Sequence, residues 1–264
     1  MKLNFCIMLF VLNLAILFSQ NFELNGRIKQ LSGLSYEINL IKDFSFDSEE
    51  IIFRDYDLGS TENDYIIKNH KYSYSEQDNL TFLELEKNER FLCLANKDLC
   101  ILYSGVESEP IYIGSNFIEF FGFPKKNGFI ASSELKEGNK IYSSVDLCNI
   151  NLDSPWVEAA DDYGIGEYVI FNANCTYIYF LNGYVSFQKP YLYTANSRVK
   201  KIKITFIDEE NKLPIIFSIN DTPNPQKLDL GFRCITRIKM EIIDVYKGDK
   251  YQDTCINGLI FRIY

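Results

Sequence analysis

Short runs of apolar residues, separated by polar turns, recur along the first half of the chain and predict strands. The runs follow one another roughly every 8 to 12 residues, a spacing typical of antiparallel barrels and sandwiches. No long amphipathic helix is evident among them, so the pattern predicts a small meander barrel. The predicted strands are Ser35–Ile41, Glu50–Phe53, Tyr65–Lys68, Leu80–Leu85, Arg90–Leu94, Cys100–Tyr103 and Pro110–Gly114.

The second half is also patterned as strands, and two of them are long. In Val199–Asp208, apolar side chains alternate with Lys201, Lys203 and Thr205, which predicts one buried face. In Ile235–Val245 the apolar positions slip by one near Arg237, which predicts a β-bulge there. The other predicted strands are Glu167–Asn172, Tyr177–Tyr184, Pro214–Ile219, Lys227–Leu230 and Leu259–Ile263.

A turn-rich segment at 123–128 combines Pro124, two lysines and an Asn-Gly pair, which is typical of a linker. We therefore expect an all-β protein with a β-rich N-terminal domain at 20–122 and a β-sandwich at 129–264. The high aromatic content, 15% of residues, favours strands further.

The N-terminus has the pattern of a secretory signal peptide. Lys2 precedes an apolar run from Phe5 to Phe18, and Ser19 is a small residue at the expected cleavage point. A membrane-spanning helix needs about 20 apolar residues, more than this run contains. We therefore predict export after cleavage of residues 1–19, to a secreted, periplasmic or cell-surface location.

The charge of the chain restricts its partners. The formal net charge is −9, and removal of Lys2 with the leader makes it −10. Nucleic-acid recognition needs a basic surface, and an anionic membrane attracts basic segments. The composition therefore argues against both as partners.

Six cysteines remain after the leader is removed, and an even number in an exported chain indicates disulfides. Sequence alone does not choose among their possible pairings. Cys93 and Cys100 flank a polar turn, so they are expected to face each other across a hairpin. A zinc site is a weak alternative, because there is no C-x-x-C motif and His70 is the one histidine. The same scarcity of histidine argues against catalysis by a Ser-His or Cys-His pair.

Several motifs in the second half occur in the order found in discoidin domains, the coagulation factor 5/8 type C or galactose-binding-like family. The opening motif is Ala131-Ser132-Ser133-x-Leu135, followed by Tyr142, Asp146 or Asp153, and Trp156-Val157-Glu158. The narrower motifs are Gly164-Ile165-Gly166-Glu167, Asn182-Gly183-Tyr184, Tyr193-x-x-Asn196-Ser197-Arg198-Val199-Lys200, and the segment Asp244–Ile256. This set resembles the discoidin-like module found beside bacterial NAD glycohydrolases.

The resemblance covers about 129–264 and implies a galactose-binding-like jelly roll that serves glycan binding and toxin translocation. Nothing in the chain resembles the NAD glycohydrolase catalytic domain, so that activity is not implied. The chain departs from the family pattern at Ser154-Pro155 and at Asn257-Gly258-Leu259, which leaves ligand specificity open.

The segment from Asp244 to Cys255 is the strongest candidate for ligand binding, because loops at the end of a β-sandwich commonly carry function. Cys255 is expected to tether it through a disulfide. For Arg198 and its neighbours, a polar binding patch and a structural ion pair with Asp208 or Glu241 are both open. The candidate ligand-binding residues are Tyr246, Lys250, Tyr251, Asp253, Asn182, Tyr184, Asn196 and Arg198.

Three further features each have two interpretations. Trp156 suits a sugar-stacking platform, but a buried core position is favoured. The pair Gly164 and Gly166 lacks the third glycine and the helix of a dinucleotide loop, so a turn with positive φ is favoured. The acids Asp153, Glu158, Asp161, Asp162 and Glu167 suit calcium in ligand type, but solvated loop acids are the commoner case.

These observations favour an exported, non-catalytic protein that binds carbohydrate or another cell-surface ligand and needs no cofactor. The alternative is an envelope structural protein that docks another protein chain. A secreted hydrolase with a carboxylate pair is less favoured, because the sequence places no two acids at a catalytic separation.

Overall fold

The structure is a computed structural model, and it describes the backbone of residues 31–37, 40–46, 50–57, 65–85, 89–96, 99–105, 111–114, 120–122, 128–148, 152–209 and 211–263. Side chains are described within 71–85, 89–96, 99–105, 128–147, 152–209 and 211–261. The predicted signal peptide, at 1–19, and most of the predicted linker lie outside these residues. Within them, no helix has the length and apolar character needed to cross a membrane.

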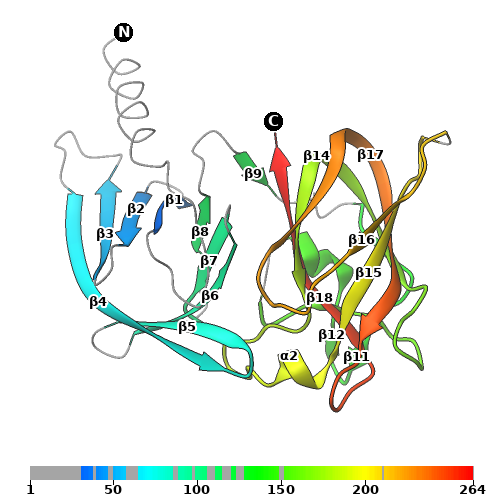
Figure 1. Ribbon diagram of the computed structural model, residues 1–264, viewed down its shortest axis with the longest axis horizontal. Coiled ribbons are helices and arrows are strands. Elements are labelled where there is room, and N and C mark those ends of the chain that lie inside the picture. Colours follow the sequence, from blue (N-terminus) through cyan, green and yellow to red (C-terminus); the bar gives the residue numbers. More distant parts are fainter. Residues whose placement is uncertain are drawn as a thin grey trace, which may run out of the picture. The chain divides into compact units, whose positions relative to one another are not determined.

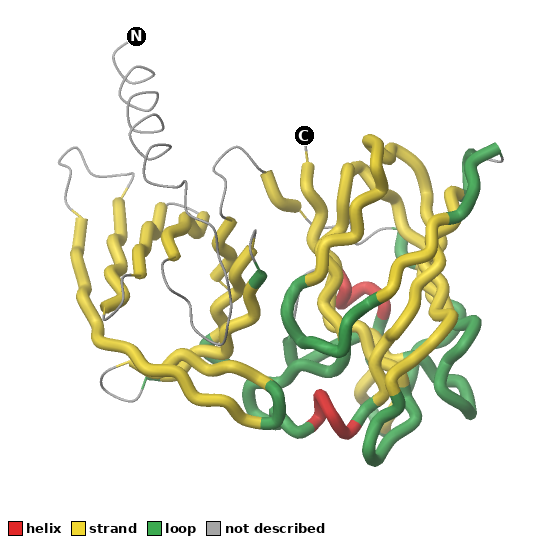
Figure 2. The backbone as a smooth tube through the Cα atoms, viewed as in Figure 1, coloured by secondary structure: helices red, strands yellow, loops and turns green. Residues whose placement is uncertain are grey.

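Strands make up most of the described chain, and the helices are two short turns (Figure 2), a 3₁₀ turn η2 at Ser144–Cys148 and α2 at Leu192–Ala195. The all-β prediction is therefore confirmed. The chain divides into two compact units. The first contains the described residues up to Ser75 and those from Thr81 to Gly114, and the second contains Glu76–Leu80 and the residues from Phe120 onward.

The first unit is an antiparallel meander in which each strand pairs with the next along the chain (Figure 1). Its first and last strands, β1 and β8, also contact each other, so the sheet curls round on itself. The strands are β1 (Leu31–Glu37), β2 (Leu40–Phe46), β3 (Glu50–Asp57), β4 (Tyr65–Gln77), β5 (Leu80–Leu85), β6 (Arg90–Ala95), β7 (Leu99–Tyr103) and β8 (Ile111–Gly114).

One predicted strand of this unit is wrong. The run Ser35–Ile41 belongs to two strands, because β1 ends at Glu37 and β2 begins at Leu40, directly opposite it. Apolar and polar residues alternate through the end of β1 and the start of β2, so the sequence pattern does not mark where one strand ends and the next begins. At the tip of the β4–β5 hairpin, Asp78 and Asn79 have φ of 51° and 66°, as a type I′ turn requires.

The second unit is a β-sandwich built on four long strands, β14 (Tyr168–Asn182), β15 (Ser197–Phe206), β17 (Gln226–Tyr246) and β18 (Thr254–Ile263). The order is β10-β14-β17-β15-β18-β13, and β14 also pairs with β18. These pairings close the four long strands around one core. The shorter strands are β9 (Phe120–Gly122), β10 (Ile130–Ala131), β11 (Lys136–Glu137), β12 (Lys140–Ile141), β13 (Trp156–Val157) and β16 (Ile215–Ser218).

Two pairs of predicted strands are single long strands in the structure. Glu167–Asn172 and Tyr177–Tyr184 are joined in β14, apart from Glu167, Gly183 and Tyr184 at its ends, and Lys227–Leu230 and Ile235–Val245 fall within β17. The β14–β17 register shifts between Cys175 and Tyr177, which are paired with Cys234 and Asp229. The intervening residues of β17 include Gly231 with φ of 74°.

The predicted bulge near Arg237 is wrong, because the register against β14 runs unbroken from Cys234 to Glu241. Ile235 faces solvent, with 65% of its surface exposed, while Cys234 faces the core. The irregularity lies earlier, between Asp229 and Cys234, and the same alternate positions face inward on both sides of it, from Leu228 to Ile242. The alternation in β15 is confirmed, since Ile202, Ile204 and Phe206 are buried.

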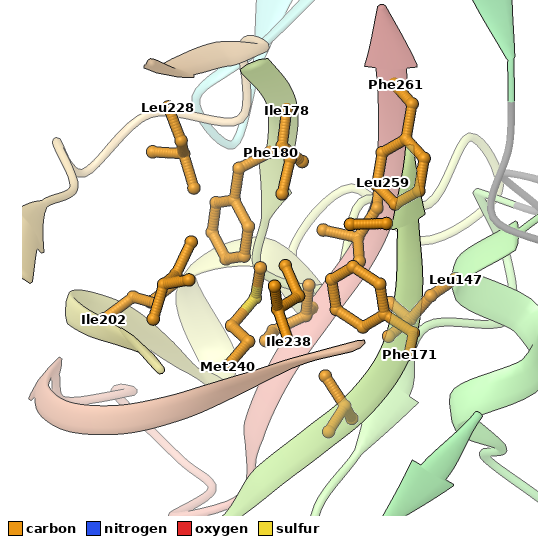
Figure 3. Close-up of a cluster of buried hydrophobic side chains, with 14 of the residues drawn as sticks. Leu147, Phe171, Ile178, Phe180, Ile202, Leu228, Ile238, Met240, Leu259 and Phe261 are labelled. Atoms are coloured by element: carbon orange, nitrogen blue, oxygen red, sulfur yellow. The ribbon is translucent and has the colours of Figure 1, made fainter. Parts of the chain in front are cut away.

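The core of the second unit lies between the long strands, and Figure 3 shows its aromatic and branched side chains filling that space. Phe171 stacks on Phe129 with ring centroids 5.3 Å apart. Trp156 is fully buried in the same core and donates its indole N–H to the Ser133 carbonyl at 3.0 Å. The core interpretation of this tryptophan is thus confirmed.

Candidate functional site: the loop end of the sandwich

Three surface segments gather at one end of the second unit: helix α2, the β11–β12 hairpin and the loop from β17 to β18 (Figure 1, lower right). The β17–β18 loop contains Lys250, Tyr251 and Asp253, which the sequence nominated for binding. Because loop ends of sandwiches present side chains without disturbing the sheets, this end is the natural candidate surface.

The β17–β18 loop is held against the end of α2 by backbone hydrogen bonds. The amide of Asp249 donates to the Thr194 carbonyl at 3.0 Å, and those of Lys250 and Tyr251 donate to the Ala195 carbonyl at 3.1 and 2.8 Å. These bonds use carbonyls that the end of a helix leaves without intrahelical partners. The loop backbone is therefore fixed by its neighbours.

Ser197 adds a second anchor at the start of β15. Its hydroxyl accepts from the Gly248 amide at 3.1 Å and donates to the Tyr251 carbonyl at 3.3 Å. A side chain at Gly248 would lie 2.5 Å from the Ala195 carbonyl oxygen, so only glycine allows this close approach. In this structure Cys255 is a buried free thiol. The disulfide tether through Cys255 stays a prediction.

Two tyrosines and a lysine remain exposed on this anchored frame. Tyr251 is 36% exposed, Tyr191 at the start of α2 is 47% exposed, and the Lys250 ammonium lies 4.8 Å from the Tyr251 ring centre. The pKa of Lys250 is raised by its contact with the Tyr251 hydroxyl and by the nearby Tyr191. We call Tyr191, Lys250 and Tyr251 the Tyr–Lys patch.

Sequence reasoning missed Tyr191. It follows Pro190 in a segment with no strand pattern. The turn of helix that brings it beside Lys250 is too short to leave a periodic signal.

Arg198 is occupied by structural contacts. Its guanidinium donates to both carboxylate oxygens of Asp221 at 2.8 Å. The remaining Nη1 donates to the carbonyls of Tyr193, Thr194 and Asn196 at 3.3, 3.2 and 2.8 Å. Only 7% of Arg198 is exposed, so it closes the end of α2 and its charge is satisfied internally.

Arg198 therefore forms a structural ion pair, as one of its two interpretations expected, but its partner is Asp221 and not Asp208 or Glu241. Asp208 instead pairs with Arg237 at 2.9 Å, and Glu241 pairs with Lys203 and Lys239, each at 2.8 Å. Asp221 lies in the turn after β16, where no strand pattern marks it as a neighbour.

Four other nominated residues are also engaged with the backbone. Both amide atoms of Asn182 bond to the backbone of Val199, at 2.8 and 2.9 Å. The side chains of Asn196, Tyr184 and Tyr246 donate to the carbonyls of Leu192, Asp153 and Ile219. These contacts hold β14, α2 and β16 in place. Of the candidate residues in the β17–β18 loop, Lys250 and Tyr251 are exposed and Asp253 is half-buried, while the other candidates support the frame beneath them.

Glu158 is a fully buried acid behind this surface. Its carboxylate accepts from the Thr254 amide at 2.8 Å and from the Ala160 amide at 2.7 Å. Burial raises the pKa of Glu158 to about 7, with a smaller contribution from Asp253 and against the effect of the two amide donors. The pKa of Asp253 is also raised, chiefly by burial.

Three of the other loop acids accept hydrogen bonds from the protein. Asp162 accepts from the Gly164 amide at 2.8 Å, Asp153 accepts from Ser186 at 2.7 Å, and Glu167 accepts from the hydroxyls of Ser132 and Ser133. Among the described side chains, no group of three or more His, Cys, Asp or Glu residues is placed to hold a metal ion. Calcium binding stays a prediction.

Gly164 and Gly166 form a turn with positive φ, at 69° and 98°, and β14 follows them. The turn interpretation is confirmed. A side chain at Gly164 would lie 2.5 Å from the Glu158 side chain, so this glycine permits the turn to close over the buried acid.

Comparison with known proteins identifies the second unit. Residues 124–262, just over half of the chain, match the model of the NAD glycohydrolase translocation F5/8 type C domain. The chain belongs to this family. The discoidin-like resemblance of the sequence motifs is thereby confirmed.

This family is a binding and translocation module rather than a catalytic domain. A search of curated proteins finds no match. Among solved structures, a mycobacterial arabinofuranosyltransferase, AftD, aligns with a TM-score of 0.38 and 9% identity. That alignment covers 66% of this chain and 14% of the transferase.

Proposed function

We propose that the protein is an exported, non-catalytic binding protein whose F5/8 type C domain recognises carbohydrate or another cell-surface ligand through the Tyr–Lys patch. The observation that carries the proposal is the pair of exposed tyrosines, Tyr191 and Tyr251, beside Lys250 on a frame fixed by backbone hydrogen bonds.

The chemistry of the patch suits a sugar. Tyrosine rings offer a flat apolar face to the apolar face of a pyranose, and their hydroxyls and the Lys250 ammonium offer hydrogen bonds to its polar edge. Because α2 and Ser197 already order the loop, binding costs little further conformational entropy.

Two features support binding over hydrolysis. Glu158 is fully buried and accepts hydrogen bonds from two backbone amides, so its carboxyl group is not open to a substrate. The family is also described as a translocation module. Export is supported by the leader-like segment at 1–19.

A glycan array probed with the full chain tests the proposal, with and without calcium. We expect binding to a defined subset of glycans. Absence of binding in both conditions would contradict carbohydrate recognition.

The alternative, docking of another protein chain, has its own structural support. Strand β16 lies at the edge of the sheet and pairs with β15, with Ile216 60% exposed and the preceding Leu213 83% exposed. Open edges with apolar side chains suit a protein partner. Capture of an envelope protein that free sugars do not displace, and that Leu213→Ala weakens, would favour this alternative.

A further inference from the structure

Two pairs of cysteines are placed side by side on neighbouring strands, one pair in each unit. In the second unit, Cys175 on β14 stands directly opposite Cys234 on β17 in the antiparallel register. Directly opposed residues in such a ladder have Cα atoms about 4.5 to 5.5 Å apart, within the range that a disulfide spans. Both side chains are fully buried and belong to the same core.

In the first unit, Cys93 on β6 and Cys100 on β7 lie diagonally across a hairpin. Cys93 is opposite Leu102 and Cys100 is opposite Ala95, so both side chains point to the same face. Their sulfur atoms are 3.8 Å apart and both thiols are buried. An S–S bond is about 2.05 Å long, so the two side chains must rotate and the hairpin strands must approach slightly for the bond to form.

We propose that Cys175–Cys234 and Cys93–Cys100 are structural cross-strand disulfides of the mature protein, one in each unit. The proposal rests on the export part of the proposed function for its occurrence in the cell, because disulfides persist in oxidising compartments. It is independent of what the Tyr–Lys patch binds.

The position of Cys175 and Cys234 gives their bond a structural role. The β14–β17 register shifts immediately after this pair, where β17 carries extra residues that include Gly231. A covalent bond between Cys175 and Cys234, the last residue pair before the shift, fixes the register of the segment that runs from this pair to Glu241. The bond therefore holds the two longest strands of the sandwich in one alignment.

The chemistry is thiol–disulfide exchange with a small disulfide or an exported thiol oxidase. Each cysteine pair loses two electrons and two protons as its S–S bond forms. The S–S bond of the oxidant breaks, and its two sulfurs take up those electrons and protons as thiols. Because all four thiols are buried in the folded chain, the exchange must occur while the strands assemble.

Mapping the disulfides of the full chain tests the proposal. The reduced, denatured protein is refolded with reduced and oxidised glutathione, denatured, treated with a thiol-alkylating reagent, and cleaved after basic and after glutamate residues. Glu158 and Glu167 separate Cys148 from Cys175, and Lys97 separates Cys93 from Cys100, so each bond joins two distinct peptides.

We expect one cross-linked peptide pair holding Cys175 and Cys234, and one holding Cys93 and Cys100. The control variant Cys255→Ala should retain both. Alkylated Cys175 and Cys234, or either residue joined to another cysteine, would overturn the assignment in the second unit. The corresponding result for Cys93 or Cys100 would overturn it in the first.

A stability measurement supports the map without depending on it. Reduction should lower the melting temperature of the wild-type protein by several degrees. In Cys175→Ser, in Cys234→Ser and in the double variant, reduction should lower the melting temperature less than it does in the wild type. The difference from the wild type should be the same in all three variants. Unequal, additive losses would show two independent thiols and contradict the bond.

Discussion

Arg198 and Asp221 form a two-point ion pair, with both nitrogen–oxygen distances at 2.8 Å, that closes the end of helix α2 beneath the Tyr–Lys patch. The same guanidinium gathers three carbonyls of the α2 segment. One arginine therefore links β15, α2 and the turn after β16. The β17–β18 loop is anchored on the carbonyls of that same segment.

Replacing Arg198 by lysine should destabilise the protein by about 2–4 kcal/mol, because an ammonium cannot bond both carboxylate oxygens and the three carbonyls at once. Urea unfolding measures the loss. Arg237→Lys is a matched control, since its pair with Asp208 is exposed and solvent screening leaves such a pair little effect on stability. Equal losses in the two variants would contradict the structural role of Arg198.

The buried Glu158 should make stability depend on pH. Its pKa is raised from the ordinary value of 4.5 to about 7, so the folded state binds a proton that the unfolded state releases between these values. The free energy of unfolding should therefore fall as pH rises from about 4.5 to 7, by up to about 1.4 kcal/mol per pH unit.

Unfolding curves of the wild type and Glu158→Gln across this range isolate the effect. Asp253 also has a raised pKa, and subtraction of the two curves removes its contribution. The difference in free energy should change with pH in the stated direction. Parallel curves would show that Glu158 ionises in the folded state as an ordinary carboxyl does.

Gly164→Ala should cost about 2–4 kcal/mol, since the added methyl group would meet Glu158 at 2.5 Å in addition to the strain of a positive φ. Gly138→Ala is the matched control. Gly138 has a similar φ of 59° but open space around it, so only the backbone strain of about 1–2 kcal/mol applies. Thermal or urea unfolding compares the two, and a Gly164→Ala loss no larger than the Gly138→Ala loss would argue against tight closure over Glu158.

Much of the fold could be predicted from the sequence, because alternation and turn residues are local signals. The strand Leu80–Leu85 was predicted with its observed bounds, and the buried face of β15 followed from simple alternation. The division of Ser35–Ile41 between two strands could not be predicted, since its turn leaves the apolar pattern unbroken.

The site was harder to predict, because its parts are brought together by tertiary contacts. Tyr191 joins Lys250 only through the fold of α2, and Asp221 reaches Arg198 from a turn with no pattern of its own. Asn182 and Arg198 carried the family motif. Motif residues also support the frame, and in this chain these two bond to Val199 and Asp221.

The affinity of the Tyr–Lys patch for a glycan identified on the array tests the central claim most directly. Calorimetric titration of the full chain should show that Tyr251→Ala and Tyr191→Ala each weaken binding about tenfold or more, as loss of an aromatic contact does. Leu213→Ala, on the loop at the other end of β15, should bind as the wild type does. Unchanged affinity in both tyrosine variants would contradict the assignment of this surface as the ligand-binding site.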